Sequence, residues 1–97
     1  METLILKNIV TDTGSNQQGE QLFSFLKDAY LNNKPLILEV DSDLTLSSSF
    51  LNSSIGLFLE QFGLVNFKKT IQFKGNKNQF DRLVSYINKY KEVYSIN

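Results

Sequence analysis

Three short apolar segments of the chain alternate with three longer segments in which apolar side chains recur at helical spacing. The short segments are rich in branched apolar residues, or alternate apolar with polar ones, and are typical of strands at residues 3–10, 36–40 and 68–73. The helical segments lie at residues 20–33, 51–62 and 80–90. This β-α-β-α-β-α order predicts an α/β fold with a mainly parallel sheet of three to four strands, flanked by helices.

The segment LILEV, at residues 36–40, is the most continuously apolar of the predicted strands. Such a run is typical of a strand covered on both faces or of a central strand in a parallel sheet, so we expect it in the sheet interior. The first two helices should end near Pro35 and Gly63, because both residues disfavour a continued helix. The last few residues of the chain should fray. The core residues predicted from the helical stripes include Leu51, Phe58, Phe80 and Ile87.

The composition excludes several kinds of chemistry. The 97 residues contain neither cysteine nor histidine, which removes disulfides, thiol nucleophiles, the commonest general base and the commonest zinc ligand. No apolar stretch is long enough to span a bilayer, and no basic residue precedes the apolar N-terminal residues as it does in a signal peptide. We therefore expect a single cytoplasmic domain over residues 1–97, without membrane association and without a cofactor or metal ion.

The net charge is zero, but the charges are unevenly distributed. Residues 1–66 hold three lysines against eight acidic residues, whereas residues 67–97 hold seven basic residues against two acidic ones. One hypothesis is that the basic third binds an anion or a nucleic acid. We favour a solvated helix face and a lysine-rich edge strand, because nucleic-acid-binding domains usually carry a stronger net basic charge. The basic residues that would bind an anion are Lys68, Lys69, Lys74, Lys77 and Arg82.

The segment DTGS, at residues 12–15, resembles the active-site signature of aspartic proteases. In those enzymes two aspartates share a proton and activate water, so Asp12, Thr13 and Gly14 could serve a homodimeric protease. Such proteases are nearly all β, however, whereas here an amphipathic helix follows within a few residues and the chain lacks a glycine-rich flap. We favour a simple turn, in which Asp, Thr, Gly and Ser are all common.

Three carboxylates, those of Glu39, Asp41 and Asp43, follow one another closely at the end of the predicted central strand. Carboxylates can hold magnesium or calcium. The glycine and the final glutamate of the calcium-binding loop pattern are missing at the required spacing, however. We therefore expect a solvated acidic loop instead of a metal site.

Three consecutive serines, Ser47 to Ser49, precede Phe50 and the second helical segment. Serine is a preferred N-cap, because its hydroxyl accepts a hydrogen bond from a free amide in the first turn. We expect Ser47 to be this cap. A structural role for all three serines, as cap and first turn, would account for the cluster without any further function.

The segment LILEVDSDLTLSSSFLNSSIGLFLEQFG joins the strand, the acidic loop and the serine-led helix, and it resembles the STAS family of bacterial anti-sigma-factor antagonists. It is more similar still to the STAS-like group, which carries a Ser-Ser-Phe opening at this helix and has no established activity. The resemblance covers nearly the whole chain and implies a small sheet of about four strands flanked by helices. Counted from Glu39, Ser47 falls on the family's aspartate, Ser48 on its phosphorylated serine, Ser49 on the neighbouring serine and Phe50 on its glycine.

This resemblance implies a non-catalytic regulatory protein-interaction module that is a monomer or a weak homodimer. In the family, a partner that is an ATP-binding kinase of the anti-sigma type phosphorylates the serine, and the added charge weakens binding. On this interpretation Ser48 is the switch, Ser47 caps the helix and Ser49 assists, with Phe50 beside them. The acidic loop is expected nearby, where its carboxylates would oppose the phosphate.

Overall fold

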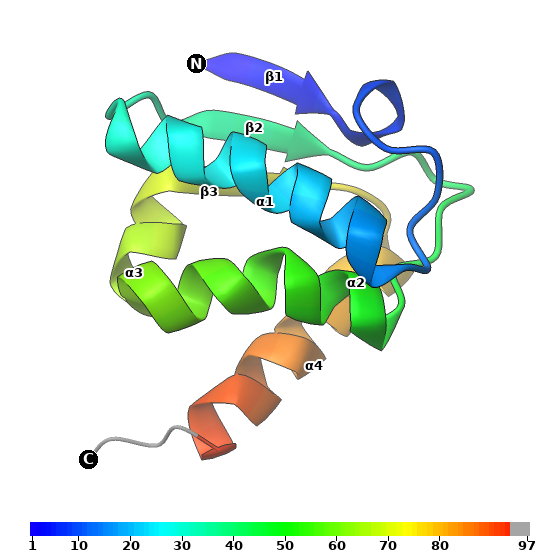
Figure 1. Cartoon of the computed structure of the whole chain (residues 1–97). Helices are drawn as coiled ribbons and strands as arrows, with labels where there is room; N and C mark the ends of the chain where they lie inside the picture. The colour runs from blue at the N-terminus through cyan, green and yellow to red at the C-terminus, as the bar shows by residue number, and fades with distance from the viewer. Residues whose placement is uncertain (94–97) are drawn as a thin grey trace.

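The computed structural model describes residues 1–93, and residues 94–97, which we expected to fray, lie outside this range. The described chain follows the predicted β-α-β-α-β-α order, with a turn of 3-10 helix after the first strand and the second helical segment divided in two (Figure 1). The elements are β1 (Glu2–Ile5), the 3-10 helix η1 (Leu6–Asn8), α1 (Asn16–Leu31), β2 (Leu36–Glu39), α2 (Ser48–Ser53), α3 (Ile55–Thr70), β3 (Ile71–Lys74) and α4 (Lys77–Val93).

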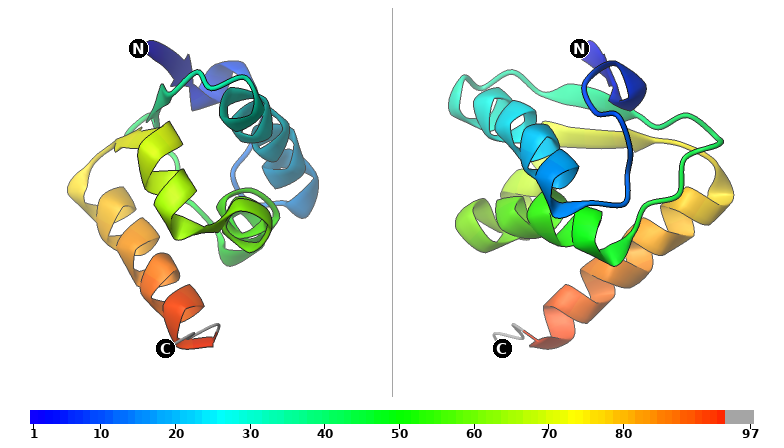
Figure 2. Two further views of the ribbon diagram at one scale, coloured as in Figure 1. Left: turned by 90° about the vertical axis from the view of Figure 1, so that its left-hand side faces the viewer. Right: turned by 45° about the vertical axis from the view of Figure 1, so that its right-hand side comes forward.

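The three strands form one parallel sheet in the order β1-β2-β3, which confirms the α/β class and the interior position of the LILEV strand. In this order, right-handed crossovers place the helices of both connections on the same face of the sheet. Figure 1 and Figure 2 show the helices gathered on one side of the strands. The burial pattern agrees, because Leu36 and Leu38 are buried whereas Ile37 and Glu39 are only half-buried. β2 is therefore a central parallel strand that helices cover on one face only.

The core lies between the sheet and the helices and contains a cluster of aromatic rings. The Phe58 side chain of α3 is fully buried, and its ring centroid lies 5.1–5.7 Å from those of Tyr30, Phe62 and Phe67. The rings meet edge to face, an arrangement that aromatic pairs prefer. Leu51 of α2 is also buried. The predicted core positions of Phe58 and Leu51 are thus confirmed.

The first and third strands are shorter than the sequence predicts. β1 ends at Ile5 instead of continuing to residue 10. The Leu6 side chain is fully buried, and its carbonyl accepts hydrogen bonds from the amides three and four residues later, which closes a helical turn. Residues 68–70 were expected in β3 but complete α3, because the amide of Ile71 still donates to the carbonyl four residues earlier.

The second helical segment was expected to be continuous but is divided at Ser54 into α2 and α3. Ser54 is fully buried with φ −120° and ψ −86°, and its hydroxyl donates to the carbonyl of Phe50 at 2.7 Å. A serine that hydrogen-bonds back to the preceding turn competes with the regular helical pattern. Gly63 breaks the helix as predicted, with φ +85°, but the chain then resumes a helical course to Thr70.

The apolar stripe of α4 is only partly covered. Leu83 is buried, whereas Phe80 is 50% exposed and Val84 is 38% exposed. The prediction that Phe80 belongs to the core is therefore wrong, and Ile87 is half-buried. The cause is that β3 is the last strand of the sheet within residues 1–93, so no further strand covers the outward side of this stripe. The result is an apolar surface beside an edge strand.

Candidate functional site

The serine cluster opens α2, and its first serine is the helix cap. The Ser47 hydroxyl accepts a hydrogen bond from the amide of Phe50 at 3.0 Å, and the Ser47 carbonyl accepts one from the amide of Leu51 at 2.9 Å. The amide of Ser47 donates to the carbonyl of Thr13 at 3.0 Å, so the cap is also tied to the loop before α1. The predicted N-cap role of Ser47 is confirmed.

Ser48 lies in the first turn of α2 with an exposed side chain. Arg82 of α4 reaches this turn, and its Nη2 donates to the Ser48 Oγ at 3.4 Å. The Arg82 Nε donates to the carbonyl of Leu46, which fixes the guanidinium against the loop. Lys89 lines the same small hollow, whose volume is about 70 Å³. The charges that the structure places around Ser48 are therefore positive, whereas the sequence led us to expect the acidic loop there.

The next two residues of the cluster differ in exposure. Ser49 is exposed, and its carbonyl accepts a hydrogen bond from the Ser53 hydroxyl at 2.9 Å. Phe50 is 1% exposed and belongs to the hydrophobic core. Its ring anchors α2 from inside the protein, so the surface that a partner could contact is formed by Ser48 and Ser49 and not by Phe50.

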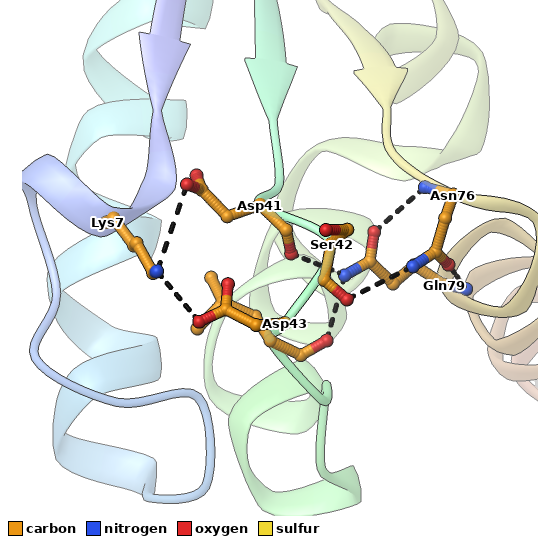
Figure 3. A network of polar contacts seen from close by, with 7 residues as sticks. Lys7, Asp41, Ser42, Asp43, Asn76 and Gln79 are labelled. Carbon is orange, nitrogen blue, oxygen red and sulfur yellow. Dashed lines mark hydrogen bonds and ion pairs between the residues drawn. The ribbon is translucent and has the colours of Figure 1, made fainter.

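The carboxylates of the acidic loop lie beside lysines of neighbouring elements. Figure 3 shows Lys7 pointing to the carboxylates of Asp41 and Asp43. The Lys7 Nζ lies 2.8 Å from the Asp43 carboxylate and 4.0 Å from that of Asp41, and the Lys74 Nζ lies 3.5 Å from the Glu39 carboxylate. In the described part of the chain, no hydrogen bond or ion pair joins these carboxylates to the serines, and no group of three or more acidic side chains is arranged to hold a metal ion. The loop is thus held in place by lysines.

The contact between Lys7 and Asp43 shifts the pKa of both groups. The hydrogen bond from the ammonium lowers the pKa of the Asp43 carboxyl, and the same bond raises the pKa of Lys7. The Asp43 contribution to stability is present at neutral pH and lost as acid titrates the carboxylate, whereas the Lys7 contribution is lost as base removes the ammonium proton. Both groups are exposed, so the pair contributes little to stability. It mainly ties the loop to η1.

A buried amide joins the acidic loop to the start of α4 (Figure 3). Gln79 is 5% exposed, and its Nε2 donates to the carbonyls of Asp41 and Leu44 at 2.7 and 2.8 Å. Asn76 and Gln79 also cap α4, because the side-chain oxygen of each accepts a hydrogen bond from the amide of the other. Gln79 and Arg82 thus hold the loop that leads into α2. Sequence reasoning missed Gln79, although the Asn-x-x-Gln pattern before an apolar stripe is a signal for such a cap.

The DTGS segment at residues 12–15 forms the turn that we favoured. The Asp12 carboxylate accepts a hydrogen bond from the amide of Gly14 at 2.9 Å, and the serine of the segment caps α1. Thr13 is buried, and its hydroxyl donates to the carbonyl of Thr45. Asp12 therefore lies in a turn of an α/β domain with a parallel sheet, which differs from the nearly all-β fold of aspartic proteases.

Three of the five basic residues proposed to bind an anion already contact other groups. Lys74 pairs with Glu39 at 3.5 Å, and Lys77 pairs with Asp81 at 3.0 Å. Arg82 is held by the loop before α2. The other two lie in the last turn of α3. This arrangement agrees better with solvated lysines around an edge strand than with a nucleic-acid interface.

The structure predicts different consequences for alanine substitutions at adjacent serines. We expect Ser47→Ala to lower the free energy of unfolding by about 0.5–2 kcal/mol, because the amide of Phe50 loses its partner, and Ser47→Asp to preserve stability. Ser48→Ala should change it by less than about 0.5 kcal/mol, because the side chain is exposed and caps nothing. Urea melting curves of the three variants test this assignment. A Ser48→Ala variant as unstable as Ser47→Ala would show that the cap has been assigned to the wrong residue.

The fold and the site together define a small α/β domain in which a capped serine cluster opens a helix beside a fixed arginine. The chain belongs to the family of STAS-like domains of unknown function (DUF4325), which matches residues 18–81. The match runs from α1 into α4 and includes the acidic loop and the serine cluster. The predicted STAS-like family and fold are thus confirmed. No curated protein and no solved structure matches the chain.

Within residues 1–93, no helix combines the length and the apolar character needed to cross a membrane.

Proposed function

We propose that this domain is a non-catalytic regulatory module that binds a protein partner through the surface around the start of α2, and that phosphorylation of Ser48 switches this binding. The observation that carries the proposal is that the Ser47 hydroxyl is occupied by the helix cap, whereas the Ser48 side chain is exposed. Membership of a STAS-like family supports a module without catalytic activity of its own. The proposed partner is an ATP-binding kinase of the anti-sigma type, acting on a monomer or weak homodimer.

The surroundings of Ser48 explain how a phosphate could change the surface without unfolding the domain. A phosphoserine carries a charge of about −1.5 to −2 at neutral pH. The Arg82 guanidinium, whose Nη2 lies 3.4 Å from the Ser48 Oγ, would donate a stronger, charge-assisted hydrogen bond to it. The phosphate would thus be held by α4 while reversing the sign of the local charge. A partner that recognises the unmodified, positively charged surface would then bind more weakly.

Neither of the alternative functions gains support from a specific observation. The Asp12 carboxylate lies in the turn before α1, in a fold unlike that of aspartic proteases. Of the basic residues, Lys74, Lys77 and Arg82 already have partners within the domain. The interaction module is therefore the one function that we propose.

The proposal predicts that a charge at Ser48 disrupts partner binding while the fold is retained. Immobilised wild-type protein and the Ser48→Ala and Ser48→Asp variants are exposed to lysate of the native host, and the captured proteins are quantified. We expect Ser48→Ala to retain the partner and Ser48→Asp to capture at least about tenfold less, which corresponds to 1.4 kcal/mol. Ser24→Asp, at an exposed position of α1, is the matched control and should bind like the wild type. A folded Ser48→Asp variant that captures every wild-type partner would refute the switch.

A further inference from the structure

An apolar groove of about 440 Å³ lies between β3, the end of α3 and α4. Its lining includes Phe73 of β3 and the outward residues of α4, among which Phe80 is 50% exposed and Val84 is 38% exposed. At 3.6 residues per turn, these α4 residues lie on the face opposite that of Arg82. The groove is therefore separate from the Ser48 surface. Its volume falls within the range typical of binding pockets, about 300–1,000 Å³.

One wall of the groove is the free edge of the sheet. β3 pairs with β2 and with no other strand of the described chain. The unpaired backbone groups of such an edge can accept a further strand. Lys74 on β3 is exposed and would oppose pairing of this edge with a second copy of itself. Lys74 itself pairs with Glu39 at 3.5 Å, so any attraction for acidic side chains must come from other lysines near this edge.

The charged side chains around the groove favour an acidic occupant. Lys68 and Lys91 line it, and neither takes part in any ion pair within residues 1–93. No acidic residue lines the groove. An occupant with apolar side chains and carboxylates would therefore match both the apolar floor and its lysines.

We propose that the groove and the edge of β3 bind an extended acidic segment of a partner protein, which pairs with β3 as a further strand. Because successive side chains of a strand point to opposite faces, one set would pack over Phe80 and Val84. Lys68 and Lys91 line the same groove as Phe80 and Val84, so the carboxylates that would meet these lysines are those at the ends of the segment. In this mode of recognition, main-chain hydrogen bonds supply affinity and the side-chain pockets supply specificity. The proposal stands independently of the Ser48 switch, because it uses the opposite face of α4.

The first test uses synthetic peptides with the whole domain. The probe is a peptide of about ten residues that alternates valine with glutamate, long enough to form one strand. We expect saturable binding in calorimetry and slowed hydrogen exchange of amides in residues 71–74. A valine–lysine peptide of the same length, and a valine–glutamate peptide N-methylated along one edge, should each bind at least about tenfold more weakly. If the methylated peptide binds as tightly as the unmodified valine–glutamate peptide, the segment does not pair with β3 as a strand. That result would overturn the proposal and would be expected if the peptide bound as a helix.

The second test changes the groove. Lys68→Glu combined with Lys91→Glu should weaken binding of the valine–glutamate peptide at least about tenfold, and Val84→Glu should do the same. The matched control is Lys27→Glu combined with Lys34→Glu, which makes the same change of charge at exposed positions outside the groove and should bind like the wild type. Melting curves confirm that each variant is folded. The proposal would be contradicted if the folded groove variants bound the peptide as tightly as the control variant. It would also be contradicted if sedimentation showed a stable dimer of the wild type that Val84→Glu dissociates, because a second copy of the chain would then cover the groove.

Discussion

Phe58→Ala should lower the free energy of unfolding by about 3–5 kcal/mol, because it removes a large side chain from a closely packed core. The Phe58 ring is completely buried and meets the rings of Tyr30, Phe62 and Phe67 at its edges, with centroid distances of 5.1–5.7 Å. These neighbours come from α1 and from both halves of α3, so a cavity here could close only by moving several elements. A loss of this size is a large fraction of the stability of a small domain.

The control for this substitution is Phe25→Ala. Phe25 is 44% exposed, so the same truncation at the surface should cost far less than at Phe58. Denaturant titration of both variants, read by circular dichroism, gives the two losses directly. Similar losses in the two variants would contradict the placement of Phe58 in the core.

Gly19→Val should lower the free energy of unfolding by about 3 kcal/mol, because the side chain has no space between α1 and α2. A Cβ at Gly19 would overlap the Ser53 hydroxyl oxygen and would lie 2.6 Å from the Phe50 carbonyl oxygen. The second contact is with backbone and cannot be relieved by rotating a side chain. The substitution must therefore push α2 away from α1, even though valine is a better helix former than glycine.

Gly14→Val provides the matched control for Gly19. The nearest atom to a Cβ at Gly14 is the Asp12 carboxylate oxygen at 3.9 Å, an ordinary contact distance. We expect this variant to change stability by less than about 0.5 kcal/mol. If Gly19→Val melts like Gly14→Val, the close packing of the two helices is wrong. Because α2 carries the serine cluster, this result would also remove the basis for the geometry of the proposed binding surface.

The parts of the fold that depend on local patterns could be predicted from the sequence. The alternation of strand and helix periods gave the parallel sheet and the central position of β2. The Ser47 cap was predictable for the same reason, because its hydrogen bond reaches only three residues along the chain. The glycine at position 63 likewise indicates a break in the helix, and its φ of +85° is one that glycine adopts readily.

The features that the sequence did not predict depend on tertiary contacts. Ser54 divides α2 from α3 through a buried hydrogen bond to the Phe50 carbonyl, although its neighbours follow a continuous helical stripe. Phe80 fits the stripe of α4 but is exposed, because the sheet ends at β3 within residues 1–93. A periodic pattern identifies which face of a helix is apolar, but it does not reveal whether another element covers that face.

The candidate site was predicted only in part, for the same physical reason. The exposed serine at position 48 follows from its place in the first turn of α2. The positive charge beside it comes from Arg82, 34 residues later, and the loop before it is held by Gln79. Such long-range contacts leave no periodic signal in a single sequence. The expectation that acidic residues surround the serines came from proximity along the chain, whereas these carboxylates lie beside Lys7 and Lys74.

The most direct test of the regulatory switch is to locate phosphate on protein isolated from its native host. Peptide mass spectrometry of the tryptic or chymotryptic segment that spans residues 47–50 distinguishes the three adjacent serines. We predict phosphate on Ser48, with none on Ser47, whose hydroxyl is occupied by the helix cap. The modification should disappear in Ser48→Ala and persist in Ser49→Ala. Phosphate confined to Ser47 or Ser49, or unmodified Ser48 in both partner-bound and partner-free protein, would contradict the switch and leave the serines with a structural role alone.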